Sequence, residues 1–257
     1  MQLKDKVILI TGGTSGIGEA CTKLFAQNGA KVVAMSIQRE AGEALAEQLT
    51  DDGLSVEFCF GDTSQESDVK AAVKLAVDRF GRLDCVHANA GVLSNQKITD
   101  ITLDEFHHLI NVNLLGPVLV AKYAIPVMES QGRGVICFTT SVAADIGFPS
   151  HAVYGASKAA VVALMRSLTT DHSPQGVRFV GVSPGTIDTP MLAASCAGWD
   201  TPKDVLYADV AKKIPVQRMG VPDDVARAVG FLLSDDAGFI SGSVVHLEGG
   251  TLCLPPW

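Results

Sequence analysis

Long hydrophobic runs and clusters of basic residues are both missing from this chain of 257 residues. The amino terminus, residues 1–6, leads into only four apolar residues before Thr11, which is too short for a signal-peptide core or a membrane span. The formal net charge is −8 and no Lys/Arg run occurs. A nucleic acid or an anionic membrane is therefore disfavoured as the main partner. These absences predict a cytoplasmic protein that acts on a small molecule.

Metal-binding patterns are absent as well. The six cysteines are scattered, without a Cys-x-x-Cys pair and without histidines at zinc spacing. Most of them lie in apolar stretches, where we expect them to be small buried residues. The neighbouring His107 and His108 cannot share one face of a helix. The sequence therefore predicts no metal site.

Hydrophobic residues, by contrast, are plentiful. They make up 47% of the chain, charged residues make up 19%, and the mean hydropathy is +0.26. This composition is typical of a globular protein and excludes the disordered class. The length allows one large domain or two small ones, each with a proper core. A protein this apolar often buries further surface in subunit contacts.

Short apolar runs alternate with longer amphipathic stretches along the chain. The runs predict strands at residues 7–10, 31–35, 55–60, 83–86, 135–138, 177–182 and 243–247. The stretches predict helices at residues 16–28, 41–49, 66–80, 103–129, 152–172 and 223–233. Repeated strand-then-helix units form a parallel sheet with helices on both faces. We therefore expect one doubly wound Rossmann-type α/β domain over residues 1–257, with a sheet of about seven strands.

A glycine-rich turn, Thr-Gly-Gly-Thr-Ser-Gly-Ile-Gly, occupies residues 11–18 after the first predicted strand. Glycines let the backbone turn tightly and approach a pyrophosphate, and a helix beginning near Gly16 aims free N–H groups at the same anion. The spacing differs from the general Gly-x-Gly-x-x-Gly fingerprint, and a tight connection is the alternative interpretation. The position between a strand and a helix favours nucleotide binding.

A second pattern joins Tyr154 to Lys158, one helical turn apart, with Ser141 after the fifth predicted strand. A free tyrosine has a pKa of about 10, so it needs help to exchange protons near neutral pH. A lysine on the same helical face can stabilise the phenolate. A serine at a strand end can also be a simple turn residue. Together with the glycine turn, the three side chains predict a catalytic site.

These motifs resemble those of the short-chain dehydrogenase/reductase family over nearly the full length of the chain. The matching segments are the glycine turn at 11–18, Asn-Ala-Gly at 89–91, Asn113, the Ser141, Tyr154 and Lys158 set, Ser-Pro-Gly-Thr-Ile-Asp-Thr at 183–189, and residues 218–250 with their terminal Glu-Gly-Gly. Six motifs in the correct order argue against a chance match.

The resemblance implies reversible hydride transfer between a nicotinamide cofactor and the carbon of a small secondary alcohol or ketone. Tyr154 would be the general acid and base, with a pKa held near the working pH by its surroundings. Lys158 would stabilise the phenolate and bond the nicotinamide ribose, and Ser141 would polarise the substrate oxygen. Asn113 would hold a water that connects Lys158 to solvent. Capping of a helix break is the alternative role for Asn113, and Asn111 is the alternative residue.

The implied cofactor contacts come from the turns that follow the strands. They are Gly12, Thr14, Ser15, Gly16, Ile17, Gly18, Ser36, Asp62, Asn89, Ala90, Gly91, Tyr154, Lys158, Pro184, Gly185, Ile187 and Thr189. Asp62 matches a residue that contacts adenine, although it could instead be the N-cap of the next helix.

The residues do not settle the choice between NAD and NADP. NAD-preferring members carry an acidic residue where Ser36 stands. NADP-preferring members carry arginine where Ile37 or Ser15 stands. Neither signature is present, and Arg39 could still reach a phosphate. The surrounding stretch resembles the NAD type with its aspartate replaced, so we expect NAD, with NADP close behind.

A variable substrate lid is implied at residues 186–215, facing a wall at 142–150. The lid carries Met191, Leu192, Cys196, Trp199, Leu206 and Tyr207, and the wall carries Asp145 and Phe148. These side chains predict a mainly apolar pocket. His151 could face the substrate or stand at the rim of the cleft.

Two other functions remain open. A 3-oxoacyl-[acyl-carrier-protein] reductase would need basic residues around the cleft, and residues 128–133 offer one arginine with an opposing glutamate. A non-enzymatic nucleotide-sensing protein could use the same fold, although the intact Ser141, Tyr154 and Lys158 count against it. The resemblance also suggests a homotetramer, with contacts through the helices that begin at Leu103 and Ala152 and through residues 252–257.

Overall fold

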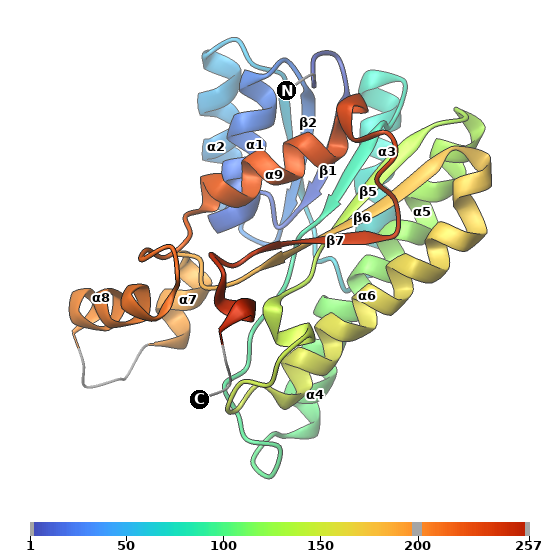
Figure 1. Cartoon of the computed structure of the whole chain (residues 1–257). Coiled ribbons are helices and arrows are strands. Elements are labelled where there is room, and N and C mark those ends of the chain that lie inside the picture. Colours follow the sequence, from blue (N-terminus) through green and yellow to red (C-terminus); the bar gives the residue numbers. More distant parts are fainter. Residues whose placement is uncertain (1–2, 197–201, 255–257) are drawn as a thin grey trace.

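A single parallel sheet lies between two layers of helices in the computed structural model, which describes residues 3–196 and 202–254 (Figure 1). The strands are β1 (Val7–Thr11), β2 (Lys31–Ser36), β3 (Val56–Phe60), β4 (Cys85–Ala88), β5 (Gly134–Thr139), β6 (Val177–Pro184) and β7 (Ser243–Leu247). The sheet has seven strands in the order β3-β2-β1-β4-β5-β6-β7, and every pair is parallel. The predicted doubly wound fold is therefore confirmed.

The apolar runs form strands because both faces of the sheet are covered. All residues of β1 and β4 are buried, as expected where helices pack on each side. The predicted strand at 83–86 begins later, at Cys85. Asp84 lies just before it, and its carboxylate accepts the Val7 N–H at 2.9 Å while its own N–H donates to the Val7 carbonyl at 2.9 Å.

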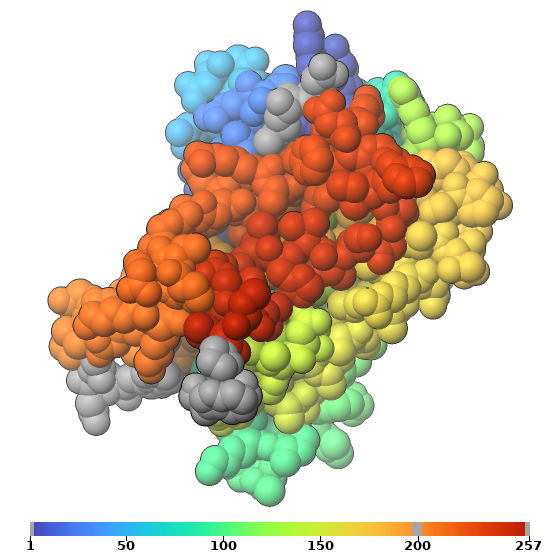
Figure 2. Space-filling view, in the orientation of Figure 1, coloured from blue at the N-terminus to red at the C-terminus, as the bar shows by residue number. Residues whose placement is uncertain are grey.

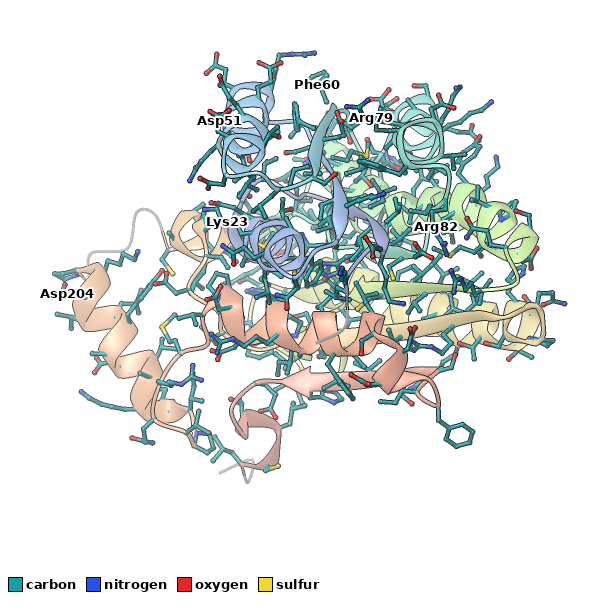
Figure 3. All side chains as sticks on the ribbon, turned by 90° about the horizontal axis from the view of Figure 1, so that it is seen from above. Lys23, Asp51, Phe60, Arg79, Arg82 and Asp204 are labelled. Atoms are coloured by element: carbon teal, nitrogen blue, oxygen red, sulfur yellow. The ribbon has the colours of Figure 1, made fainter. Side chains whose placement is uncertain are left out.

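Nine α-helices cover the sheet in the described part of the chain. They are α1 (Gly16–Gln27), α2 (Arg39–Asp51), α3 (Glu66–Phe80), α4 (Leu103–Ile110), α5 (Gly116–Ser130), α6 (Ala152–His172), α7 (Pro190–Ser195), α8 (Lys203–Lys213) and α9 (Pro222–Leu233). Helices α1, α2 and α9 pack on one face, and α3, α5 and α6 pack on the other. Figure 3 shows charged side chains such as Asp51 and Asp204 pointing outward from these helices.

The predicted helix at 103–129 is interrupted. Residues Asn111–Leu115 form a π-helical turn that separates α4 from α5. Asn113 is completely buried within this turn. A π-turn in a helix often marks a functional position, and the hydrogen bonds of Asn113 described below explain why it persists here.

The stretch Leu103–Ser130 is the one helical segment among the described residues that is long and apolar enough to cross a membrane. Half of its most apolar window is buried inside the protein. Leu119, Val120, Ala124 and Met128 of α5 belong to the hydrophobic core. Its apolar character is therefore explained by packing against the sheet.

Two short helices between β6 and α9 were not predicted. The orange segment that contains α8 stands out from the body of the domain (Figure 2).

The burial of the cysteines also differs from expectation. Cys21, Cys85 and Cys137 are buried, whereas Cys59 and Cys196 are partly accessible and Cys253 is exposed. Those three lie at a strand end, at the end of α7 and near the carboxyl terminus, where fewer elements pack over them.

Candidate active site

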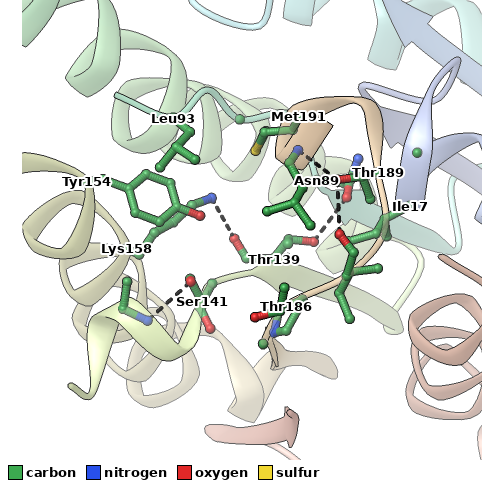
Figure 4. A pocket seen from close by; sticks show the side chains of 18 of the residues that line it. Ile17, Asn89, Leu93, Thr139, Ser141, Tyr154, Lys158, Thr186, Thr189 and Met191 are labelled. Carbon is green, nitrogen blue, oxygen red and sulfur yellow. Dashed lines mark hydrogen bonds between the residues drawn. The ribbon is translucent and has the colours of Figure 1, made fainter. Parts of the chain in front are cut away.

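A cavity of about 320 Å³ opens at the carboxyl ends of the central strands (Figure 4). The chain leaves β1 toward β2 on one side, while β4 lies on the other side, so the strand order reverses between β1 and β4. Open parallel sheets bind their ligands at such a reversal. The position of the cavity therefore follows from the topology.

The glycine turn forms one end of this cavity. Gly12 and Gly16 have φ values of 65° and 52°, a conformation that favours glycine. A Cβ on Gly18 would stand 1.9 Å from the Gly12 carbonyl oxygen, so the turn and α1 can meet only if residue 18 is glycine. The cap residue Ser15 makes no side-chain cap bond, which leaves the first N–H groups of α1 available to an anion. This cradle fits the pyrophosphate of a dinucleotide.

The Asn-Ala-Gly segment ties β4 to the glycine turn. The Asn89 side-chain amide donates to the Thr11 and Gly12 carbonyls at 3.2 and 3.4 Å. The Thr11 hydroxyl oxygen accepts the N–H groups of Asn89 and Ala90, both at 3.1 Å. A Cβ on Gly91 would lie 3.2 Å from Lys158 Nζ. The segment therefore connects the glycine turn to Lys158.

Ser141, Tyr154 and Lys158 meet on one side of the cavity (Figure 4). The Ser141 oxygen accepts the Ala143 N–H at 3.2 Å, which leaves its own hydrogen to donate to the Tyr154 phenol oxygen. Lys158 Nζ donates to the Thr139 carbonyl at 3.0 Å and lies 5.8 Å from the centroid of the Tyr154 ring. The three predicted side chains are thus brought together.

Burial dominates the electrostatics of Tyr154 and Lys158. Burial lowers the pKa of Lys158 to about 8. Burial also raises the pKa of Tyr154 above its ordinary value, and the hydrogen bond from Ser141 opposes this with a smaller effect. The ammonium of Lys158 is bonded to a backbone carbonyl, not to the phenol. The protein by itself therefore favours the protonated phenol, and a pKa near the working pH with the cofactor bound stays a prediction.

Asn113 lies behind the cavity, not in its wall. Its side-chain oxygen accepts the Val92 N–H at 2.8 Å, and its amide nitrogen donates to the Val92 carbonyl at 2.9 Å and to Ser157 Oγ at 3.2 Å. Asn111 is exposed, so the structure selects Asn113 over that alternative. The side chain holds the segment after Gly91 in place. A water-holding role for it stays a prediction.

The residues predicted at the adenosine end lie outside the main cavity. Thr14 Oγ1 is 2.8 Å from Ser36 Oγ, which also accepts the Gln38 N–H at 3.1 Å. The Arg39 guanidinium lies 3.9 Å from the Phe60 ring centroid and 3.4 Å from the Glu43 carboxylate. The turn from β2 into α2 is therefore organised by neutral hydroxyl and amide groups.

Asp62 does not cap the next helix. Its carboxylate accepts the Ser64 N–H at 2.8 Å, and α3 begins later, with Gln65 in the cap position. The N-cap alternative for Asp62 was wrong because three residues of turn separate it from the helix start at Glu66. The adenine contact stays a prediction.

The segment after β6 closes the cavity from the far side. Pro184, Gly185, Ile187 and Thr189 all line it. A Cβ on Gly185 would stand 2.8 Å from the Glu248 Cβ, so the Glu-Gly-Gly segment packs directly behind this wall. The Thr189 hydroxyl accepts the Leu192 N–H at 3.3 Å and so begins α7.

Of the two lid helices, only α7 lines the cavity in the described part of the chain. Met191 and Leu192 line the cavity, whereas Leu206 and Tyr207 of α8 do not. Asn95 Nδ2 donates to the Ser195 carbonyl at 2.9 Å and links the lid to the segment after β4. Trp199 lies outside the described residues.

The wall at 142–150 contributes Val142, Ala143 and Phe148 to the cavity. Asp145 turns away from it and pairs with His246 Nε2 at 3.1 Å. The loop lines the cavity as expected, but Asp145 is not among its lining residues, because His246 of β7 offers it an imidazole partner.

Sequence reasoning missed Thr139 and Leu93, which both line the cavity. Thr139 accepts the Lys158 ammonium at its backbone carbonyl, and a backbone contact cannot be predicted from the type of side chain. Leu93 follows the Asn-Ala-Gly motif closely, and that proximity could have marked it. Among residues 3–196 and 202–254, no three His, Cys, Asp or Glu side chains are grouped so that they could hold a metal.

Comparisons with known proteins agree with this geometry. A family model described as enoyl-(acyl carrier protein) reductase matches residues 12–251. Cyclohexanol dehydrogenase from Acinetobacter sp. is 34% identical, with 96% of this chain and 95% of the relative covered. The crystal structure of levodione reductase superimposes with a TM-score of 0.93 at 32% identity, covering 98% of this chain and 99% of that one.

The structure of a 3-ketoacyl-(acyl-carrier-protein) reductase from Brucella melitensis, complexed with NADH, has a TM-score of 0.88 at 32% identity and covers 97% of this chain and 99% of that one. The match extends over nearly the whole chain in each case. The chain is an oxidoreductase that belongs to the short-chain dehydrogenase/reductase family.

Proposed function

We propose that the protein is an NAD(P)-dependent alcohol dehydrogenase or carbonyl reductase that interconverts a small secondary alcohol and its ketone. The observation that carries this proposal is the Tyr154 ring, whose centroid lies 5.8 Å from Nζ of the buried Lys158, with Ser141 lining the same cavity. These groups share one cavity with the glycine cradle. An acid–base group and a dinucleotide site in one cavity are what hydride transfer at an alcohol carbon requires.

In this reaction Tyr154, Ser141 and Lys158 each have a separate role. A bound nicotinamide supplies the acceptor or donor of hydride. Tyr154 gives or takes the proton at its phenol oxygen, and Ser141 donates a hydrogen bond at the same place. Lys158 uses one N–H on the Thr139 carbonyl, so two further donors remain for the ribose hydroxyls of the cofactor. Its charge also favours the phenolate whenever Tyr154 loses its proton.

NAD is the cofactor that the adenosine end favours. Ser36 and Ile37 carry no charge there, and Arg39 is already engaged by Phe60 and Glu43. A 2′-phosphate would need a cation that is free to form a bidentate pair. The NADH complex of the Brucella melitensis relative supports the same choice. NADP remains the competitor, since no carboxylate at position 36 repels a phosphate.

The cavity favours a small substrate with apolar substituents. Leu93, Val142, Phe148, Met191 and Leu192 line it, and Lys158 is the one Lys or Arg among the described lining residues. An acyl-carrier protein is acidic and would need more positive charge near the opening. The 3-oxoacyl-thioester reductase remains the second candidate because of the Brucella melitensis relative.

A homotetramer is part of the proposal. Leu103, Phe106, Leu115 and Val118 of α4, the π-turn and α5 are all exposed large hydrophobic residues. Their number on one continuous helix supports a subunit contact there. The predicted contact through residues 252–257 falls partly outside the described residues, at 255–257. A size-exclusion or light-scattering measurement checks the oligomer, and a cytoplasmic location stays part of the proposal.

A fluorescence titration with NADH and NADPH tests the proposal without knowledge of the substrate. We expect NADH to bind more tightly, and turnover of secondary alcohols or ketones to follow at the nicotinamide absorbance. Acetoacetyl thioesters in the same assay test the second candidate. Failure to bind either dinucleotide would rule out the enzyme.

A further inference from the structure

His151 stands directly over the catalytic tyrosine. It precedes α6, lines the cavity and is half-buried. Its ring centroid lies 5.9 Å from that of Tyr154, with the two ring planes at 81°, and 6.0 Å from that of Phe148. The imidazole is therefore part of the substrate wall, next to the group that exchanges the proton.

The backbone before His151 is held in an unusual conformation. Ser150 has a φ of 62°, although it is not glycine. The His151 N–H donates to the Phe148 carbonyl at 3.3 Å, and the His151 carbonyl accepts the Gly155 N–H at 2.7 Å. A left-handed serine is strained, and such strain persists where the surrounding structure fixes it. The turn therefore gives His151 one defined position.

The tautomer of His151 follows from its one hydrogen bond to the protein. Nδ1 lies 2.6 Å from the Pro149 carbonyl oxygen, and a carbonyl can only accept. The proton of the neutral imidazole is therefore on Nδ1, and Nε2 is a bare acceptor. Within residues 3–196 and 202–254, no protein group hydrogen-bonds Nε2.

This acceptor belongs to a cavity whose larger lining side chains are mainly apolar. They are Leu93, Val142, Phe148, Met191 and Leu192, and Thr186 is a hydroxyl residue in the same lining. In the proposed reaction, Ser141 and Tyr154 both hydrogen-bond the oxygen that reacts. A substrate with one oxygen therefore has no use for His151, whereas a substrate with a neighbouring hydroxyl can donate to Nε2.

We propose that His151 selects substrates that carry a second hydroxyl on the carbon next to the reacting one, that is, vicinal diols and α-hydroxyketones. The inference rests on the proposed alcohol dehydrogenase activity. His151 accepts a hydrogen bond at Nε2 and takes no part in the transfer of hydride or proton. A half-exposed neutral acceptor of this kind gives a preference of about tenfold over the substrate that lacks the hydroxyl.

Matched substrates test this inference. We expect kcat/KM for 1,2-cyclohexanediol to exceed that for cyclohexanol about tenfold in the wild-type protein. His151→Phe keeps a flat ring at the position but removes the acceptor, so the ratio of the two kcat/KM values should fall to about one. His151→Gln, which retains an acceptor oxygen, should keep part of the preference.

Phe148→Leu is the control on the same wall. This substitution alters the shape of the wall but removes no hydrogen-bond acceptor. It should therefore change kcat/KM for both substrates by a similar factor and leave the ratio of the two values high. Binding of NADH by each variant shows that it has folded. A wild-type ratio of the two kcat/KM values of one or below, or an unchanged ratio in His151→Phe, would overturn the role of His151. Turnover of cyclohexanol in the same assay would still support the proposed dehydrogenase activity. Absence of turnover with any alcohol or ketone would instead remove the proposed function and this inference together.

Discussion

The two ends of the predicted dinucleotide site are built in different ways. At the catalytic end, Lys158 is 4% exposed and its ammonium is fixed by a backbone carbonyl. At the adenosine end, Ile37 is 66% exposed, and Arg39 lies on the surface of α2. The catalytic end therefore depends on buried groups that the fold itself orients. The adenosine end combines the buried Ser36 with the exposed Ile37 and Arg39, and the exposed pair can change without disturbing the core.

The largest expected effect lies at the catalytic end. Tyr154→Phe removes the proton donor and should lower kcat by about a thousandfold, while NADH still binds. Tyr123→Phe is the matched control, because Tyr123 bonds only Glu66 on the outer surface and should leave kcat unchanged. Steady-state kinetics with a ketone substrate and an NADH titration measure both. Substantial turnover by Tyr154→Phe would show that another group transfers the proton.

Lys158 should make stability depend on pH in a way that an exposed lysine does not. Burial lowers its pKa from 10.5 to about 8, so between these values the unfolded chain binds more protons than the folded protein. The free energy of unfolding of the wild type should rise, relative to Lys158→Met, by about 2 kcal/mol between pH 8 and 10. Denaturant unfolding at several pH values measures the difference.

Lys70→Met supplies the comparison for this experiment, because Lys70 is exposed on α3. Its curve of unfolding free energy against pH should run parallel to that of the wild type over the whole pH range. Parallel unfolding curves for wild type and Lys158→Met would contradict the buried charge.

The protonated form of Lys158 is also the one that supports the phenolate. We therefore expect kcat/KM to decline as the pH rises through about 8.

A smaller effect is expected at the adenosine end. Ser36→Asp places a carboxylate beside Thr14 and Gln38, where it would face a 2′-phosphate. The dissociation constant for NADPH should rise at least about tenfold through like-charge repulsion, while that for NADH changes little. Ser130→Asp, at the exposed end of α5, adds the same charge elsewhere and should affect neither cofactor. An equal loss of affinity for NADH and NADPH in Ser36→Asp would show that the adenosine ribose does not bind beside residue 36.

The smallest effect should come from the lid. Asn95→Ala removes the hydrogen bond to the Ser195 carbonyl, which is exposed to solvent. We expect KM for the substrate to rise about two- to threefold, with kcat little changed. Asn28→Ala, at the end of α1 and distant from the cavity, serves as the control. If both variants behave alike, the link between lid and β4 has no role in substrate binding.

The fold could be predicted because the central strands are buried apolar runs and the crossovers are amphipathic stretches. The break at Asn111–Leu115 could not, because it depends on the buried amide of Asn113 bonding Val92, a tertiary contact without a local signal. The site residues could be listed from motifs and from the family resemblance. The pKa of Tyr154 could not, since desolvation depends on everything that packs around the phenol.

The lid shows the same limit from another side. Thr186 and Pro215 bracket a segment whose composition predicts an apolar wall. Of its two helices only α7 lines the cavity in the described residues, and Tyr207 of α8 packs toward Asp188 and Lys203 instead. Composition cannot say which apolar side chains of a lid face the substrate, because that depends on where each helix begins.

The π-helical turn also sets the angular phase of the helices on either side of it. Each residue of an α-helix advances about 100° around the axis, so one extra residue in a turn rotates all that follows. Deleting Val112 would let α4 run into α5 as one regular helix, but it would also turn either Asn113 away from Val92 or the face of α5 away from the sheet. A one-residue deletion that relaxes the backbone should therefore be more damaging to this protein than most substitutions in the same turn.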